Sequence, residues 1–308
     1  MKEWYDGFTF GNVTDIYNPW SIINYLSKGS FATYWADTSS NSLVGKLIRE
    51  GSRDIKQSFE KLMQGECLRT AIDEQIVYDQ LEQNESAIWS LLLASGYLKV
   101  AGFTAYEGKC SYDDVEEPEY EFQLTNLEVR LMFRNMVKGW FGVARSDYND
   151  FIKALLMGNI KAMNTYMNRV ALATFSYFDT GKKPSEETEP ERFYHGFVLG
   201  LMVDLSDRYV ITSNRESGFG RYDVMLEPRN KDAGLSNHDA RLNQCDAIIM
   251  EFKVRDEESE GTLQDTVQSA LKQIDEMQYQ TSLIEKGIAP ERIKKYGFAF
   301  EGKRVLIG

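Results

Sequence analysis

The fold of the C-terminal part of this chain is decided by two apolar stretches, Gly220-Arg221-Tyr222-Asp223-Val224-Met225-Leu226 and Asp246-Ala247-Ile248-Ile249-Met250-Glu251-Phe252-Lys253-Val254. Each is a short run of β-branched and large apolar residues that ends in polar, turn-forming sequence, which predicts a β-strand. Side chains alternate between the two faces of a strand, so Glu251 and Lys253 share one face. An apolar strand therefore carries a carboxylate beside an amine.

Asp223 joins Glu251 and Lys253 in one cluster if the two strands are neighbours in the sheet. Charged side chains placed there need a partner, a metal or water, since an unpaired buried charge is heavily penalised. Two carboxylates suit Mg²⁺ or Mn²⁺, which prefer hard oxygen ligands and often bridge a phosphate. The lysine can orient or deprotonate the attacking water, or neutralise charge on a phosphate oxygen. The pattern indicates metal-assisted phosphodiester hydrolysis.

An Asp followed by Glu-x-Lys on two adjacent strands, and then by a helix, resembles the PD-(D/E)xK nuclease superfamily. More narrowly, several spaced blocks resemble the nuclease domain attached to AAA-ATPase-like proteins that are common in gut bacteria. Such blocks in the same order are far more specific than Glu-x-Lys alone. They are Ser213-Asn214-Arg215-Glu216-Ser217-Gly218-Phe219-Gly220-Arg221-Tyr222-Asp223, Ile249-Met250-Glu251-Phe252-Lys253-Val254, Ala270-Leu271-Lys272-Gln273-Ile274 and Tyr296-Gly297-Phe298-Ala299-Phe300-Glu301-Gly302-Lys303.

The resemblance implies a divalent-metal-dependent nuclease with a restriction-endonuclease-like αβββαβ mixed sheet flanked by helices. Asp223 and Glu251 would hold Mg²⁺ (or Mn²⁺), Lys253 would be the catalytic lysine, and Gln273 would face the site from a helix. In the family an acid on the first helix often completes the set, and Glu191 is the nearest match. The favoured substrate is DNA, by resemblance alone.

Glu216 and Arg221 are accessory candidates close to the same site, although an ion pair that stabilises a turn explains them equally well. His195 is interpreted as a packed helix histidine and His238 as a residue of a polar loop, so the histidines offer no zinc or triad site. Tyr279 is interpreted as a core residue at a helix edge. The alternative for the whole cluster is a structural set of salt bridges, in a non-catalytic interaction protein that retains a nuclease-like fold.

The chain has 308 residues, of which 43% are hydrophobic, so it is long enough for two or three domains with ordinary cores. Its formal net charge of −12 is awkward for a nucleic-acid binder, because phosphate contacts supply much of the affinity. This charge favours dependence on another domain or subunit. Basic residues around the candidate site leave room for a local basic groove: Arg215, Arg221, Lys253, Arg255, Lys272, Lys294, Lys295, Lys303 and Arg304.

The remaining composition predicts a cytoplasmic protein. No run of about 18 uncharged apolar residues occurs, so no membrane span is expected. The N-terminus lacks the basic, then apolar, then small-residue order of a signal peptide. Cys67, Cys110 and Cys245 are widely spaced and form no CxxC pair, which suggests neither a disulfide framework nor a zinc site.

Residues 1–42 resemble the C-terminal end of the ATPase domain in the same family. The resemblance rests on Trp4-Tyr5-Asp6-Gly7-Phe8 and Tyr17-Asn18-Pro19-Trp20-Ser21, the second of which predicts a helix from Trp20 with Asn18 or Ser21 as its cap. We expect the ATPase core itself to be absent. Gly45-Lys46 and Gly181-Lys182 lack both the required earlier glycine and a following Ser or Thr, so no ATP site is predicted.

Residues 43–145 are predicted to form helices followed by a hairpin, a winged-helix-like module. Its hairpin tip carries the acidic segment 113–119, which favours packing or domain coupling over DNA reading. Residues 146–184 form a helical connector, and a domain boundary is expected in the charged linker 180–190. The nuclease-like domain then covers residues 185–308. Its expected order is helix 193–203, strands 209–213, 220–226 and 246–254, helix 263–286, and strands 296–300 and 303–307.

Overall fold

The computed structural model describes residues 1–36, 38, 41–72, 85–104, 119–178, 188–217, 220–229 and 245–308. Within these helices and strands, the side chains of residues 85, 104, 175–178, 188–193, 215–217, 221 and 222 are not described. The chain forms two compact units, Met1–Met136 and Val137–Gly308, which meet inside one helix, α6 (Leu127–Trp140). The linker in which a domain boundary is predicted lies mostly outside the described residues, and the predicted four-part division stays a prediction.

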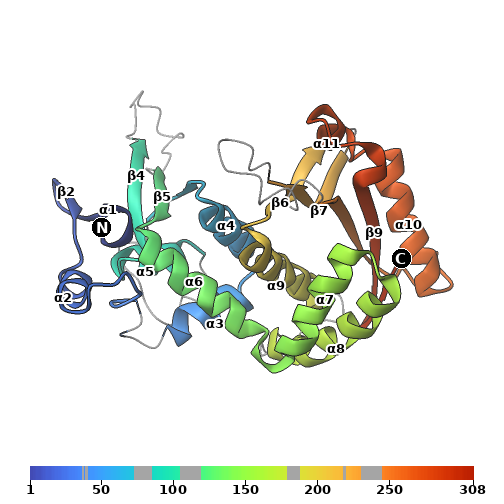
Figure 1. Cartoon of the computed structure of the whole chain (residues 1–308), viewed down its shortest axis with the longest axis horizontal. Helices are drawn as coiled ribbons and strands as arrows, with labels where there is room; N and C mark the ends of the chain where they lie inside the picture. Colours follow the sequence, from blue (N-terminus) through green and yellow to red (C-terminus); the bar gives the residue numbers. More distant parts are fainter. Residues whose placement is uncertain are drawn as a thin grey trace, which may run out of the picture. The chain divides into compact units, whose positions relative to one another are not determined.

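The second unit contains a mixed five-stranded sheet in the order β10-β9-β8-β7-β6 (Figure 1). Strands β8 and β9 are parallel, while the other neighbours are antiparallel. The predicted mixed sheet is confirmed, and so is the predicted order of its strands and helices. The bounds are α9 (Thr188–Leu205), β6 (Tyr209–Ser217), β7 (Gly220–Pro228), β8 (Ala247–Val254), α10 (Leu263–Glu276), α11 (Thr281–Glu285), β9 (Ile293–Glu301) and β10 (Arg304–Ile307).

The single helix predicted for residues 263–286 is wrong, because the chain breaks between α10 and α11. Gln278 has a left-handed φ of 52°, and the resulting turn directs Tyr279 and Leu283 into the core, where they are 1% and 0% exposed. Polar sequence around the break has good helix propensity, so burial of these two side chains overrides it. Met277, the residue that follows α10, is 37% exposed.

Both faces of the sheet are covered by side chains. On one face Phe252 stacks on Phe298 with ring centroids 4.5 Å apart, and Tyr194 of α9 packs beside it with its ring centroid 4.7 Å from that of Phe252. The other face packs against α10 and α11, and Glu251 lies on it because side chains alternate along β8. The core on this second face consists of Met225, Ala247, Ile249, Ile274, Tyr279, Leu283 and Ile293.

Helices α7 (Arg145–Met157) and α8 (Ile160–Phe178) belong to the second unit, where α8 packs along the edge strand β10. Two amides one turn apart on α8 pair with the backbone of β10. Asn168 donates to Val305 O at 2.7 Å and accepts from Val305 N at 3.0 Å. Asn164 does the same with Ile307, at 2.8 Å in both directions. Side chains thus satisfy the polar edge that a terminal strand otherwise exposes.

Replacing Asn168 by alanine is expected to lower the free energy of unfolding by about 1–3 kcal/mol, since both backbone groups of Val305 lose their partner. Amide exchange at Val305 should accelerate in parallel. Thr165→Ala, at an exposed position of the same helix, is the matched control. Equal stability of the two variants would show that water replaces the asparagine without cost.

The first unit begins with a short helix and a β-hairpin, and it continues with helices around a three-stranded antiparallel sheet in the order β3-β5-β4. The predicted hairpin of the sheet is confirmed, and its acidic tip lies outside the described residues. Asn18 caps its helix as predicted, through bonds to Trp20 N at 3.0 Å and Ser21 N at 3.2 Å. The elements are α1 (Lys2–Tyr5), β1 (Phe8–Phe10), β2 (Val13–Ile16), α2 (Pro19–Lys28), α3 (Ser42–Glu50), α4 (Arg53–Gln64), β3 (Leu68–Thr70), α5 (Glu85–Ala94), β4 (Leu98–Thr104), β5 (Glu119–Leu124) and the first turns of α6.

Glu128, on the first turn of α6, is a fully buried carboxylate that ties the start of the chain to this helix. It accepts hydrogen bonds from Ser21 Oγ at 2.8 Å, from Tyr34 N at 2.5 Å and from Trp35 N at 2.7 Å. Bonds to a charged acceptor are stronger than neutral ones. A buried donor that loses its hydrogen bond lowers the stability of the folded state.

Glu128→Ala should therefore destabilise the first unit by about 3 kcal/mol or more, because several buried donors lose one acceptor together. Chemical denaturation followed by tryptophan fluorescence measures the loss. Glu66→Ala, at an exposed position of the same unit, is expected to change stability little. An equally small effect of both substitutions would contradict the anchoring role of Glu128.

Candidate active site

The candidate site lies where β7 and β8 stop pairing. Their ladder joins Val224 to Met250 as its last pair, and the next residues on the two strands are Asp223 and Glu251. Asp223 Oδ2 instead accepts a hydrogen bond from the backbone N–H of Phe252 at 2.8 Å. Because a carboxylate takes the place of a ladder carbonyl, the two strands separate while the carboxylate stays fixed beside Glu251.

Gln273 reaches this point from α10. Its Nε2 donates to Glu251 Oε1 and also to the hydroxyl oxygen of Tyr279, at 3.0 Å. Tyr279 thus has the core position expected from the sequence, and it also supports the amide that contacts Glu251. The sequence gives no indication of this second role, because it depends on the break between α10 and α11.

Glu251 is the most perturbed carboxyl group near the site. Its side chain is 4% exposed, and Oε2 is buried without a hydrogen-bond partner among the described residues. Burial, and after it the charge of Asp223, raise the pKa of Glu251 from 4.5 to about 8, while the charge of Lys253, a backbone hydrogen bond from Asp223 and the amide of Gln273 act in the opposite direction. The nearby cation and amide therefore do not compensate fully for the buried charge.

Lys253 follows two residues after Glu251, on the same face and closer to solvent. Its charge lowers the pKa of Glu251, which means that the ammonium lies within electrostatic reach of the carboxylate. In the part of the chain that the structure describes, Lys253 forms no ion pair or hydrogen bond. The ammonium is therefore not held by another described side chain.

The accessory candidates cannot be placed in the site, because the side chains of Glu191, Glu216 and Arg221 lie outside the described set. At the level of the backbone, Glu191 belongs to α9, and Glu216 is the cross-strand partner of Arg221 on the β6–β7 hairpin. This register is compatible with the cross-strand ion pair already considered from the sequence. His195 is 2% exposed and packs edge-on against Tyr194 with ring centroids 4.7 Å apart, as expected for a packed histidine.

Several cations of the predicted basic groove are paired with carboxylates. The partners are close in sequence or on neighbouring elements, and these contacts reduce the charge available for a phosphate. The pairs are Arg255 with Glu301, Lys272 with Glu276, Lys294 with Asp246, Lys295 with Asp275 and Arg304 with Glu301. Cys67 and Cys245 are free thiols, and Cys110 and His238 lie outside the described residues.

The two carboxylates at the site fit a hard divalent cation whose remaining ligands are water or phosphate. Among the residues with described placement, no group of three or more His, Cys, Asp or Glu side chains could hold a metal ion. Asp223 and Glu251 supply two carboxylates, and Glu251 Oε2 is a buried acceptor for which the described part of the chain offers no donor. Mg²⁺ keeps several waters and is often bound by one or two carboxylates plus a phosphate, so two protein ligands suffice.

Comparisons with known proteins agree with the interpretation of the second unit. Residues 189–308 match the family model of the PD-(D/E)XK nuclease superfamily, and this range contains Asp223, Glu251, Lys253 and Gln273. An uncharacterized protein in the vnfD 5′ region of Azotobacter chroococcum mcd 1 is 22% identical over 130 residues, which are 42% of this chain. The aligned segment spans only 22% of the length of that relative. No solved structure matches the chain at a significant level.

None of the helices in the described ranges is both long enough and apolar enough to span a membrane. The expectation that the chain has no membrane span agrees with this finding for those ranges.

Proposed function

We propose that this protein is a divalent-metal-dependent nuclease that hydrolyses phosphodiester bonds at the junction of β7 and β8. The proposal is carried by one observation: Asp223 and Gln273, which lie far apart in sequence, meet at the buried carboxylate of Glu251, whose Oε2 forms no described hydrogen bond. The family match of residues 189–308 supports metal-dependent nuclease chemistry for this unit.

Asp223 and Glu251 would hold Mg²⁺ or Mn²⁺, which supplies a more acidic water and neutralises charge on the phosphate when bound. The chain orients both carboxylates in advance. Phe252 N–H fixes Asp223 Oδ2, and Gln273 holds Glu251 Oε1 so that Oε2 remains available. Preorganised ligands of this kind cost little reorganisation during the reaction.

Lys253 would act beside the attacking water or the phosphate. An ammonium close to Glu251 can hold a hydroxide in position, or stabilise negative charge that develops on a non-bridging oxygen. The position next to Glu251 and the lack of a described ion-pair partner favour this role over a structural one.

DNA as substrate, and coupling to an ATPase domain upstream, are the finer parts of the proposal. They rest on the family resemblance of the sequence blocks and on the net charge of −12, which disfavours unaided binding of nucleic acid. Helices α3 to α6 with the β3-β5-β4 sheet would then form a winged-helix-like module that serves domain coupling.

The second candidate function is a non-catalytic interaction or regulatory protein with a retained nuclease-like fold. Ion pairs around the sheet favour this second function, because basic residues that are paired with carboxylates are less available to bind a nucleic-acid backbone. An enzyme and an interaction protein differ in one measurable respect, which is metal-dependent bond cleavage.

Cleavage of labelled single-stranded, double-stranded and branched DNA, and of RNA, separates the two functions. With Mg²⁺ or Mn²⁺ the wild type should cut at least one substrate, whereas Glu251→Ala and Lys253→Ala should not. Lys153→Ala, at an exposed lysine of α7 that pairs with Asp150, should retain activity. Cutting that survives both site substitutions would contradict this site, and absence of cutting of every substrate, with either metal and with ATP added, would favour the interaction protein.

A further inference from the structure

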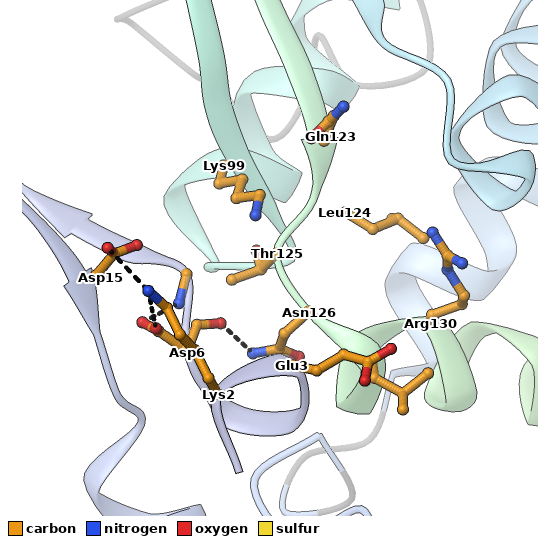
Figure 2. Close-up of a pocket in the computed structure, with 12 residues that line it drawn as sticks. Lys2, Glu3, Asp6, Asp15, Lys99, Gln123, Leu124, Thr125, Asn126 and Arg130 are labelled. Atoms are coloured by element: carbon orange, nitrogen blue, oxygen red, sulfur yellow. Dashed lines mark hydrogen bonds and ion pairs between the residues drawn. The ribbon is translucent and has the colours of Figure 1, made fainter.

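A cavity of about 320 Å³ lies wholly within the first unit (Figure 2). It is bounded by α1, the end of β2, the paired strands β4 and β5, and the start of α6. Its volume is at the lower end of the ~300–1,000 Å³ range that is usual for small-molecule sites. Neither the family match nor the candidate active site includes any of its residues.

One side of this cavity is rigid, because the segment after α1 lies in close contact with the segment before α6. Gly7 has a φ of +111°, and a Cβ at this position would lie 2.4 Å from Thr125 O. Only glycine permits both the backbone conformation and this approach. Asn126 Nδ2 also donates to Asp6 O at 3.0 Å. The segment that carries α1 is therefore fixed against the start of α6.

The charges around the cavity are unequally compensated. Lys2 pairs with Asp15 at 3.3 Å and lies 3.9 Å from Asp6, so one ammonium is shared by two carboxylates. Lys99 and Arg130 are half-buried cations, and within the described ranges neither has a hydrogen bond or an ion pair. Figure 2 shows Lys99 on the wall made by β4 and β5, and Arg130 on the wall made by α6.

We propose that this cavity binds a phosphate group between Lys99 and Arg130. Two cations that lack described partners line the same cavity and can provide charge-assisted donors for an oxyanion. The phosphate is either free or part of a nucleic-acid backbone, and the chemistry of recognition is the same for both.

Glu3 is the one exposed acid in the cavity lining that forms no described ion pair. Its carboxylate would repel an anion bound in the same cavity, so it should weaken binding. Removal of the Glu3 charge should therefore strengthen phosphate binding, whereas removal of the charge of Lys99 or Arg130 should weaken it. A substitution that merely disturbs the fold would weaken phosphate binding in every variant, so it would not produce tighter binding in Glu3→Gln.

The test is isothermal titration of the full chain with inorganic phosphate, in a buffer that holds ionic strength constant with chloride. Lys99→Met and Arg130→Met should each weaken binding about tenfold or more, as expected for a lost charged hydrogen bond. Glu3→Gln should tighten it, and Lys46→Met, at an exposed lysine outside the cavity, should leave it unchanged. Circular dichroism verifies folding, with Lys99→Gln as a second, milder substitution.

A parallel titration with an oligothymidylate distinguishes the two sources of phosphate. Binding of both probes with the same dependence on Lys99 and Arg130 assigns a phosphodiester backbone, whereas binding of inorganic phosphate alone assigns a free phosphate. The proposal is overturned if phosphate binds no better than chloride, or if folded Lys99 and Arg130 variants bind phosphate like the wild type. The candidate active site is intact in all these variants, so failure here leaves the nuclease proposal unaffected.

Discussion

Replacement of Glu251 by glutamine is expected to stabilise the metal-free protein at alkaline pH, although it removes a residue of the candidate site. The folded state raises the pKa of this carboxyl from 4.5 to about 8, so between these values the folded chain binds a proton more tightly than the unfolded chain. The free energy of unfolding must then fall as the pH rises through this window, and remain low above it. A glutamine carries no charge and escapes this penalty.

The expected gain for Glu251→Gln well above pH 8 is about 5 kcal/mol, since the pKa rises from 4.5 to about 8 and each pKa unit corresponds to about 1.4 kcal/mol. The free energy of unfolding is measured by denaturation in the presence of a chelator at about pH 5 and about pH 9, near the two ends of the pH range in which it should fall. The wild type should lose stability between them, and Glu251→Gln should lose much less. Glu276→Gln, at an acid with 60% of its side chain exposed, is the matched control.

A wild type whose stability does not fall between these pH values would contradict the raised pKa of Glu251. The same would follow if Glu251→Gln were less stable than Glu276→Gln at alkaline pH. Added Mn²⁺ provides an independent comparison. It should restore stability to the wild type at alkaline pH and leave Glu251→Gln unchanged, because only the ionised carboxylate gains from the cation.

The second large effect is expected for Lys253→Met in the cleavage assay. A methionine keeps the length and apolar stem of the side chain but removes its charge. We expect the rate of phosphodiester cleavage to fall about 10²–10⁴-fold, the usual contribution of a positioned proton-transfer or charge-stabilising group. Mn²⁺ binding should persist, because Asp223 and Glu251 remain.

Lys153→Met is the matched control for this prediction, since Lys153 is an exposed lysine that pairs with Asp150 on α7. It should retain the wild-type rate within about twofold, as expected for a surface substitution. A Lys253→Met protein that cleaves as fast as this control would show that the lysine has no part in the reaction. Loss of Mn²⁺ binding in Lys253→Met would instead indicate a structural role.

The strands that build the candidate site were predictable because each is a short apolar run with polar ends. Their adjacency followed from the expected order of elements, and the structure brings Gln273 to Glu251 as that order implies. The stopping point of the ladder was not predictable. It depends on Asp223 accepting the Phe252 amide, a tertiary contact that no local pattern encodes.

Two further features escaped sequence reasoning for related reasons. The break at Gln278 falls in sequence with good helix propensity, and it is imposed by burial of Tyr279 and Leu283. Glu128 looks like an ordinary acid in the first turn of a helix, yet it is fully buried and accepts bonds from residues about a hundred positions away. Local propensity carries no information about such long-range partners.

The claim on which the proposed function depends is that Asp223 and Glu251 jointly hold a divalent cation. Calorimetric titration of the wild type with Mn²⁺ tests it most directly, because it needs neither the substrate nor an ATPase domain. We predict saturable Mn²⁺ binding that is lost in Asp223→Asn. Asp275→Asn is the control and should retain this binding, because Asp275 is an exposed residue of α10 that pairs with Lys295. Binding that survives unchanged in Asp223→Asn, or no binding at all by the wild type, would contradict the account.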